Sequence, residues 1–188
     1  MISPQLTGTK VVFGPCRLSY TYLFKKFTPE GGEGGKYMTN VLIPADEKET
    51  LTAINKAVAA AKADGVKKKW EGKEPKKLVM PLRDGDDRDK DVETYEGMMY
   101  LNAKCSTRPG IQDRRGNPIV DEEEIYSGVW AIVSVTFYPY DASGNKGVAC
   151  GLNNIMKIAD GERLGGRSSA AADFANVTYD FGDDDDLV

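Results

Sequence analysis

The 188-residue sequence contains no histidine and only three cysteines. Without histidine, the chain cannot form the Ser–His or Cys–His pairs of common nucleophilic enzymes, and it has no imidazole general base. Cys16, Cys105 and Cys150 are widely spaced and include no Cys-x-x-Cys pair. Because three scattered cysteines cannot close a tetrahedral zinc shell, we expect reduced, buried thiols. The sequence therefore predicts a protein with no metal site, no cofactor and no catalytic residues.

Long apolar runs and phosphate-binding loops are also missing. No apolar stretch approaches the ~20 residues that a membrane span needs. The first residues have neither the basic segment nor the apolar core of a signal peptide. Neither Gly-x-x-x-x-Gly-Lys-Ser/Thr nor a Gly-x-Gly-x-x-Gly that follows a strand occurs. We therefore expect a cytoplasmic protein with no membrane partner.

The distribution of charge along the chain is uneven. After Ala172 there are six acidic residues and no basic one. Without these six, 25 basic residues face 23 acidic ones, a net charge of +2, whereas the whole chain carries −4. The end of the tail consists of Asp183, Asp184, Asp185, Asp186, Leu187 and Val188.

A polyanionic tail behind a basic, aromatic body indicates a protein that binds a polyanion and carries its own competitor. The alternative is a disordered terminus that only increases solubility.

Hydrophobic periodicity predicts a chain of mainly β structure. Apolar and β-branched residues predict strands over residues 10–24, 36–44, 78–82, 98–107, 129–140 and 146–157. Leu51, Ile54 and Val58 recur at helical spacing between Asp46, a predicted N-cap, and Gly65, a predicted helix end.

Five or six strands with one helix, and no βαβα alternation, favour a five-stranded, OB-fold-like Greek-key barrel. We expect this barrel to carry one inserted α-helix, extra hairpins and the acidic tail. The predicted domain covers residues 1–167, and a flexible tail covers residues 168–188.

Cations and aromatic rings lie close together in the sequence. A nucleic-acid-binding protein needs cations for phosphates and flat apolar faces for bases. Tyr100, Lys104 and Arg108 lie at positions i, i+4 and i+8, which would share one face of a single strand. Arg163 and Arg167 flank a glycine-containing loop that could close over DNA. The predicted DNA-binding residues are Tyr20, Tyr22, Lys25, Lys26, Arg83, Tyr100, Lys104, Arg108, Arg163 and Arg167. The alternative for each strand aromatic is a place in the core.

Two acidic patterns could bind a metal instead. Asp87-x-Asp89-x-Asp91 resembles the start of a calcium loop, but Val92 replaces the turn glycine, so we reject a calcium site of that kind. Asp46 and Glu71, with Lys73, could form a small metal-dependent nuclease site, because such enzymes need paired carboxylates and a lysine. Surface charge is the alternative explanation for this second pattern.

Four segments occur in an order that resembles a family of tailed-phage single-stranded DNA-binding proteins, first catalogued as a domain of unknown function. The resemblance covers most of the body and implies an OB fold, binding of single strands without sequence preference, and no catalytic activity. The tail is similar to those of replicative single-strand-binding proteins, although Leu187-Val188 replaces their terminal phenylalanine. The four segments are Pro81-Leu82-Arg83-Asp84-Gly85-Asp86, Asn102-Ala103-Lys104 with Arg108-Pro109, Tyr126-Ser127-Gly128, and Gly161-Glu162-Arg163-Leu164-Gly165-Gly166-Arg167.

The resulting hypothesis is a sequence-independent single-stranded DNA-binding protein that acts in phage replication or recombination, in the cytoplasm of the host cell. Its tail would compete for the DNA groove and recruit phage or host replication and recombination proteins. Two alternatives stay open: the small metal-dependent nuclease, and a non-catalytic phage structural or assembly protein.

Overall fold

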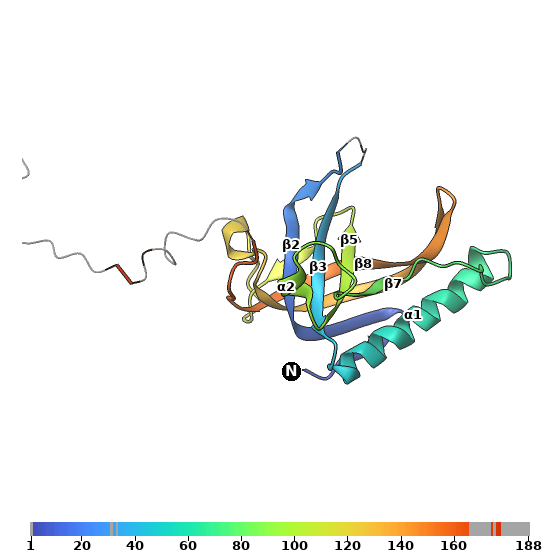
Figure 1. The fold of residues 1–188 in the computed structure, drawn as a ribbon, viewed down its shortest axis with the longest axis horizontal. Helices are drawn as coiled ribbons and strands as arrows, with labels where there is room; N and C mark the ends of the chain where they lie inside the picture. The colour runs from blue at the N-terminus through green and yellow to red at the C-terminus, as the bar shows by residue number, and fades with distance from the viewer. Residues whose placement is uncertain (1, 31, 33, 166–173, 175, 178–188) are drawn as a thin grey trace, which may run out of the picture.

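Five strands form a closed barrel in the computed structural model, which describes residues 2–30, 32, 34–165, 174, 176 and 177 (Figure 1). Neighbouring strands pair antiparallel in the order β5-β3-β2-β7-β8, and a short parallel pairing of β5 with β8 closes the ring. This is the strand arrangement of an OB fold, and it confirms the predicted fold class. The barrel strands are β2 (Lys10–Phe27), β3 (Lys36–Pro44), β5 (Met98–Cys105), β7 (Trp130–Ala142) and β8 (Asn145–Ala159).

Shorter elements extend the barrel at its edges. A long helix is inserted between β3 and β5, as the sequence predicts, and it packs beside the barrel against β7 (Figure 1). The strand predicted at residues 78–82 is instead found at β4, while Val79 forms a single bridge to Gly147. The remaining elements are β1 (Gln5–Thr7), α1 (Lys48–Lys68), β4 (Leu82–Asp84), α2 (Val92–Tyr95), β6 (Gly110–Gln112) and the 3-10 helix η1 (Glu122–Glu124).

The core fills the barrel and the space beneath α1. In β3, Val41 and Ile43 point inward, as expected from period-two alternation, and Leu42 between them points to the other side, where it packs in a separate cluster with Tyr95 and Tyr100. Ile54 and the small residues of α1 pack against the same cluster. Cys16 and Cys150 are buried and Cys105 is half-buried, all as free thiols. Burial raises the pKa of the Cys16 and Cys150 thiols.

The inward-facing parity of β2 changes twice along its 18 residues. Phe13 is in the core, then Cys16 and Leu18, and finally Leu23, so the inward residues pass from odd to even and back to odd positions. Register shifts follow Phe13 and Ser19. Each extra residue in a bulge moves the following side chains to the opposite face of the sheet. In one continuous strand, even-numbered residues therefore face the core at Cys16 and Leu18 and the surface at Tyr22.

Helix α1 continues past the predicted end at Gly65 to Lys68. The reason is a tertiary contact, because Gly65 packs directly against the buried indole of Trp70. A Cβ atom at this position would lie 2.6 Å from Trp70 and 2.9 Å from Pro139. The Trp70 Nε1–H also donates to the carbonyl oxygen of Tyr140 at 3.2 Å, which joins the end of α1 to the β7–β8 hairpin. Gly65 is thus a packing glycine inside the helix.

Replacing Gly65 with alanine should destabilise the protein by about 1–3 kcal/mol, because the new methyl group overpacks the contact with Trp70. Helix propensity alone predicts the opposite sign, a gain of about 1 kcal/mol. Urea unfolding of Gly65→Ala measures the difference. The control is Ala63→Gly at an exposed position of the same turn, which should lose about 1 kcal/mol from propensity. A Gly65→Ala variant more stable than the parent would contradict the packing argument.

Several expectations fall outside the described residues. Arg167, the predicted boundary between residues 167 and 168, and the acidic tail cannot be compared with the fold. Among the described residues, no helix combines the length and apolarity that crossing a membrane requires.

Candidate nucleic-acid interface

One surface groove collects several of the predicted residues at the end of β2. It has a volume of about 610 Å³ and lies between the second half of β2, α2, η1 and the segment that follows β8. We call it the tyrosine groove. Its lining includes Tyr20, Tyr22, Phe24, Lys25, Tyr126, Arg163 and Leu164.

A bulge in β2 turns Tyr22 toward solvent. Ser19 pairs with Asn40, so regular pairing would place Tyr22 opposite Tyr37, whose side of β3 faces inward. The extra residue instead places Tyr22 opposite Met38, on the outer face, where 37% of Tyr22 is exposed. Tyr20 lies within this bulge with a left-handed φ of 52°. Without the bulge, the alternation of β2 would direct Tyr22 toward the core. With the bulge, Tyr22 lies on the surface.

The cations of the tyrosine groove are already paired with carboxylates. Lys25 Nζ lies 3.1 Å from Glu122 Oε1, and Arg163 Nη2 lies 3.8 Å from Glu123 Oε2. The guanidinium of Arg163 also stacks on the Tyr126 ring, 4.1 Å from its centroid. Both carboxylates and Lys25 are more than half exposed and Arg163 is about one third exposed, so each ion pair contributes at most about 1 kcal/mol. A polyanion could replace Glu122 and Glu123 at small cost.

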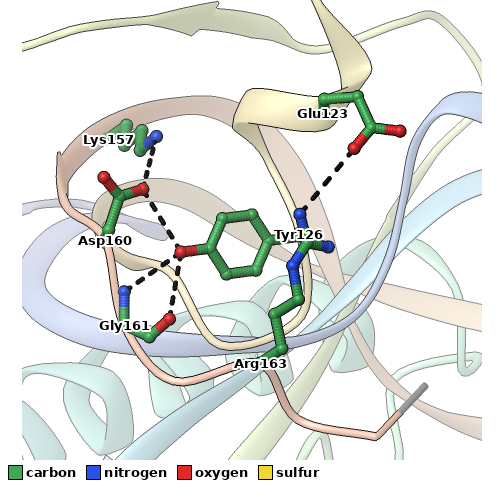
Figure 2. A network of polar contacts seen from close by, with 6 residues as sticks. All are labelled: Glu123, Tyr126, Lys157, Asp160, Gly161 and Arg163. Carbon is green, nitrogen blue, oxygen red and sulfur yellow. Dashed lines mark hydrogen bonds and ion pairs between the residues drawn. The ribbon is translucent and has the colours of Figure 1, made fainter. Parts of the chain in front are cut away.

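A polar network fixes the backbone that carries Arg163 (Figure 2). The Tyr126 hydroxyl lies 3.0 Å from the carbonyl oxygen of Gly161 and 3.2 Å from Asp160 Oδ1, and it accepts from the Gly161 N–H at 3.3 Å. Lys157 Nζ holds Asp160 at 2.8 Å, and this contact is the main reason that the pKa of Asp160 is lowered. The network places Arg163 over the ring at the rim of the tyrosine groove.

Arg88 is a central residue that the sequence analysis missed. Its guanidinium lies 4.0 Å from the ring centroid of Tyr95, 5.2 Å from that of Tyr100 and 5.9 Å from that of Tyr20. Asp91 pairs with Arg88 at 3.5 Å and accepts a short hydrogen bond from the Tyr20 hydroxyl, which raises the pKa of Tyr20. The only sequence signal was a lone arginine in an acidic stretch, which is typical of a solvated loop.

The expectation that Tyr100 offers a free ring face is wrong for this structure. Only 6% of Tyr100 is exposed, because Tyr95 packs edge-on against its ring and Arg88 lies over it. The expected continuation of this face to Arg108 also fails, since β5 ends at Cys105. Arg108 lies instead over the ring of Phe24, at 4.2 Å, beside the tyrosine groove. A strand period cannot reveal where the strand stops.

A second groove holds two further predicted cations, Arg83 and Lys104, together with Lys36, which the predicted set does not include. It has a volume of about 510 Å³, and we call it the lysine groove. Lys36, Arg83 and Lys104 line it, together with the exposed side chains of Met80 and Tyr138. In the part of the chain that the structure describes, none of these three cations forms an ion pair.

The positive charges of this groove act on one another. The pKa of Lys104 is lowered, first by partial burial and then by the charges of Lys36 and Arg83. The groove therefore brings together like charges without a counter-ion from the described residues. Such an arrangement is unfavourable in the free protein and favourable when an anion binds. The lysine groove therefore has the electrostatics of a phosphate site.

The two grooves lie on one continuous outer face. Tyr22 pairs with Met38 on β3, and Met38 pairs with Lys104 on β5. Because neighbouring strands are about 4.8 Å apart, Tyr22 and Lys104 are separated by about 10 Å across this row. In OB folds, the outer face of the second and third barrel strands is the usual surface for oligonucleotides, and here those strands are β3 and β5. Lys26 is not part of this row, because its Nζ lies 5.6 Å from the ring centroid of Tyr37, which is on the other side of β3.

The residues of the nuclease alternative do not come together. Asp46 precedes α1 and Glu71 follows it, and the 21-residue helix separates them by about 30 Å. Among the described residues, no three acidic or cysteine side chains are grouped so that they could hold a metal ion.

Comparison with known proteins identifies the family. The family described as "Enterobacter phage Enc34, ssDNA-binding protein" matches residues 9–188. The chain belongs to this family. A curated relative, putative protein p50 of Acyrthosiphon pisum secondary endosymbiont phage 1, is 29% identical over 174 residues, covering 87% of this chain and 91% of the relative.

Solved structures share the fold. The single-stranded DNA-binding protein of bacteriophage Enc34, in complex with ssDNA, has a TM-score of 0.76 at 23% identity, covering 87% of this chain and 94% of that one. The gp2.5 single-stranded DNA-binding protein of bacteriophage T7 has a TM-score of 0.58 at 19% identity, covering 92% and 96%.

The sequence segments that carry the family resemblance surround the two grooves. Arg83 and Lys104 line the lysine groove, and Tyr126 and Arg163 line the tyrosine groove. Gly128 has a φ of 123°, and a Cβ atom there would collide with the Glu162 carbonyl oxygen. The glycine in Tyr126-Ser127-Gly128 therefore allows the segment after β8 to approach closely.

Substituting Lys36 with glutamine should raise the pKa of Lys104, because one of its two like-charged neighbours disappears. An NMR titration of the lysine Cε resonances measures this change. Lys25→Gln is the matched control, since Lys25 lies in the other groove and is paired with Glu122. An unchanged Lys104 pKa in Lys36→Gln would show that the three cations do not face one another.

Proposed function

We propose that this protein binds single-stranded DNA without sequence preference and acts in phage DNA replication or recombination, in the host cytoplasm and without catalysing a reaction. The observation that carries the proposal is the cation cluster of the lysine groove, which has no ion-pair partner among the described residues and lies on the same outer face as exposed tyrosines. Family membership supports the same conclusion, since a solved relative of the same fold contains bound ssDNA.

Phosphate neutralisation is the first part of the proposed mechanism. Lys36, Arg83 and Lys104 would contact the backbone, and binding would release counterions condensed on the DNA. In the tyrosine groove, phosphates would take the places of Glu122 and Glu123 on Lys25 and Arg163. Arg108 and Lys26 would extend this path at its edges.

Base stacking is the second part. Tyr22, which the bulge turns outward, would offer its ring to a base, and Tyr20 would do so at the rim of the Arg88 cluster. Each stacked base contributes ~1–3 kcal/mol with little regard to which base it is. Because both cations and rings recognise groups that every nucleotide carries, the binding would be independent of sequence.

Replacing Lys36, Arg83 and Lys104 together with glutamine should weaken binding to oligo-dT and reduce its salt dependence. For single strands, each lost phosphate contact reduces the slope of log K against log salt by about 0.7, so three losses reduce it by about 2. Fluorescence anisotropy at four salt concentrations measures the slope. A charge-matched control replaces Lys10, Lys48 and Lys56, which line neither groove.

Equal slopes for the two triple variants would contradict the assignment of the lysine groove. A gel shift of the parent protein with poly-dT and with duplex DNA tests the function itself. A phage structural or assembly protein would shift neither. Cleavage of labelled single strands in magnesium would support the nuclease alternative and overturn a binding-only role.

The acidic tail would regulate this binding. Asp183 to Asp186 carry the same charge as phosphates, so the tail would compete for the grooves in the absence of DNA. Released by DNA, the tail and its tip, Leu187 and Val188, would recruit phage or host replication and recombination proteins.

Ending the chain after Gly182 should tighten binding to oligo-dT at low salt and flatten its salt dependence, because the internal competitor is removed. Isothermal titration at two salt concentrations measures both effects. A chain that lacks only Leu187 and Val188 is the control, because it keeps the four aspartates and should bind as the parent does. Unchanged affinity after the longer truncation would refute the competition.

A further inference from the structure

Tyr138 on β7 is an exposed aromatic residue that the predicted DNA-binding set does not include. Its side chain lies in the lysine groove, and 42% of the residue is exposed. Its ring lies close to Gly151 in β8, where a Cβ atom would be 3.3 Å from the ring carbon Cε1 and 3.7 Å from Cδ1. A glycine at this position allows the ring to lie close against the sheet.

The environment of Tyr138 differs from that of the other exposed tyrosines. Tyr22 packs on Phe27, with ring centroids 4.8 Å apart, and Tyr20 is held by Asp91 and Arg88. Within the described residues, Tyr138 has no aromatic or cationic partner, and its hydroxyl forms no hydrogen bond. The exposed part of the Tyr138 ring is therefore not covered by an aromatic or cationic side chain of the described residues and is available to a ligand.

The closure of the barrel places the Tyr138 ring beside the three cations of the lysine groove. Gly151 pairs with Lys104 across the parallel contact between β8 and β5. The two cations that lower the pKa of Lys104 line the same groove. Met80, 39% exposed, adds an apolar side chain. A flat apolar surface can stack on the base of a nucleotide, and the neighbouring cluster of positive charge can bind its phosphate.

We propose that the lysine groove is a nucleotide subsite in which Tyr138 stacks on an unpaired base and Lys36, Arg83 and Lys104 hold the adjacent phosphate. The subsite rests on the proposed single-stranded DNA binding and adds a residue to it. A base in a duplex has no free face to offer, so the ring selects unpaired strands. Gly151 acts as a positioning residue, because a side chain at this position would contact the ring.

The experiment compares Tyr138→Ala with the conservative variant Tyr138→Phe in the full-length protein. The ligands are oligo-dT and an oligonucleotide of the same length made of abasic sugar–phosphate units. On oligo-dT, Tyr138→Ala should bind roughly 5- to 150-fold more weakly, while Tyr138→Phe should bind like the parent. On the abasic strand, all three proteins should bind alike, because no base is present to stack.

The salt dependence separates stacking from loss of phosphate contacts. Stacking releases no condensed counterions, so Tyr138→Ala should keep the parent slope of log K against log salt. A loss of affinity that is equal on oligo-dT and on the abasic strand would overturn the stacking role. So would parent-like binding of Tyr138→Ala to oligo-dT. If the parent protein itself does not bind oligo-dT, the proposed function fails and not only this subsite.

A tryptophan at the same position tests the subsite without removal of a ring. In Tyr138→Trp, oligo-dT should quench the added indole emission beyond the change that the native Trp70 and Trp130 show in the parent. The abasic strand should leave that emission unquenched. Equal quenching by both strands, or none by either, would refute stacking at this position even if the alanine variant does not fold.

Discussion

The pairing between β5 and β8 is the constraint on which the surface of this protein depends. It consists of two parallel residue pairs, Ala103 with Cys150 and Lys104 with Gly151. These pairs turn an open sheet into a barrel, and they bring together side chains that lie almost fifty residues apart in the chain. Without the closure, Lys104 would have no neighbour in β8, and Tyr138 would not lie beside it. The lysine groove is therefore a product of barrel closure.

The two grooves differ in how their charges are compensated. In the tyrosine groove, Lys25 and Arg163 have carboxylate partners in η1, so the free protein is electrostatically satisfied there. In the lysine groove, three cations line one surface without a partner among the described residues, and the pKa of Lys104 is lowered by its partial burial and by the charges of Lys36 and Arg83. In the proposed binding mode, a phosphate would relieve repulsion in the lysine groove and would exchange with carboxylates in the tyrosine groove.

Close packing around the grooves keeps the contact residues in place. Arg88 fills the space between Tyr95, Tyr100 and Tyr20, while the Tyr126 network holds the backbone of Arg163. Because Tyr100 is buried under Arg88, it is not available as a stacking ring. Its side chain instead packs beneath the outer surface of β3 and β5. In the proposed subsite at Tyr138, the ring likewise lies close to a neighbouring residue, Gly151.

From the sequence alone, local signals such as period-two alternation and turn residues predicted the five barrel strands, the long helix α1 and the barrel class, and four segments carried the family resemblance. The short elements β1, β6, α2 and η1 were not predicted, and the strand expected at residues 78–82 lies at β4. The sequence also identified Arg83, Lys104 and Tyr22 as surface candidates from their neighbours in the chain. Which of these residues are exposed, and which lie side by side, depends on the tertiary structure. The bulge in β2 turned Tyr22 outward, Arg88 covered Tyr100, and the end of β5 at Cys105 separated Arg108 from Lys104. Packing on Trp70 carried α1 past Gly65, and barrel closure placed Tyr138 beside Lys104. These outcomes depend on contacts between distant segments, and residue spacing along one strand contains no information about which segment will lie across from it.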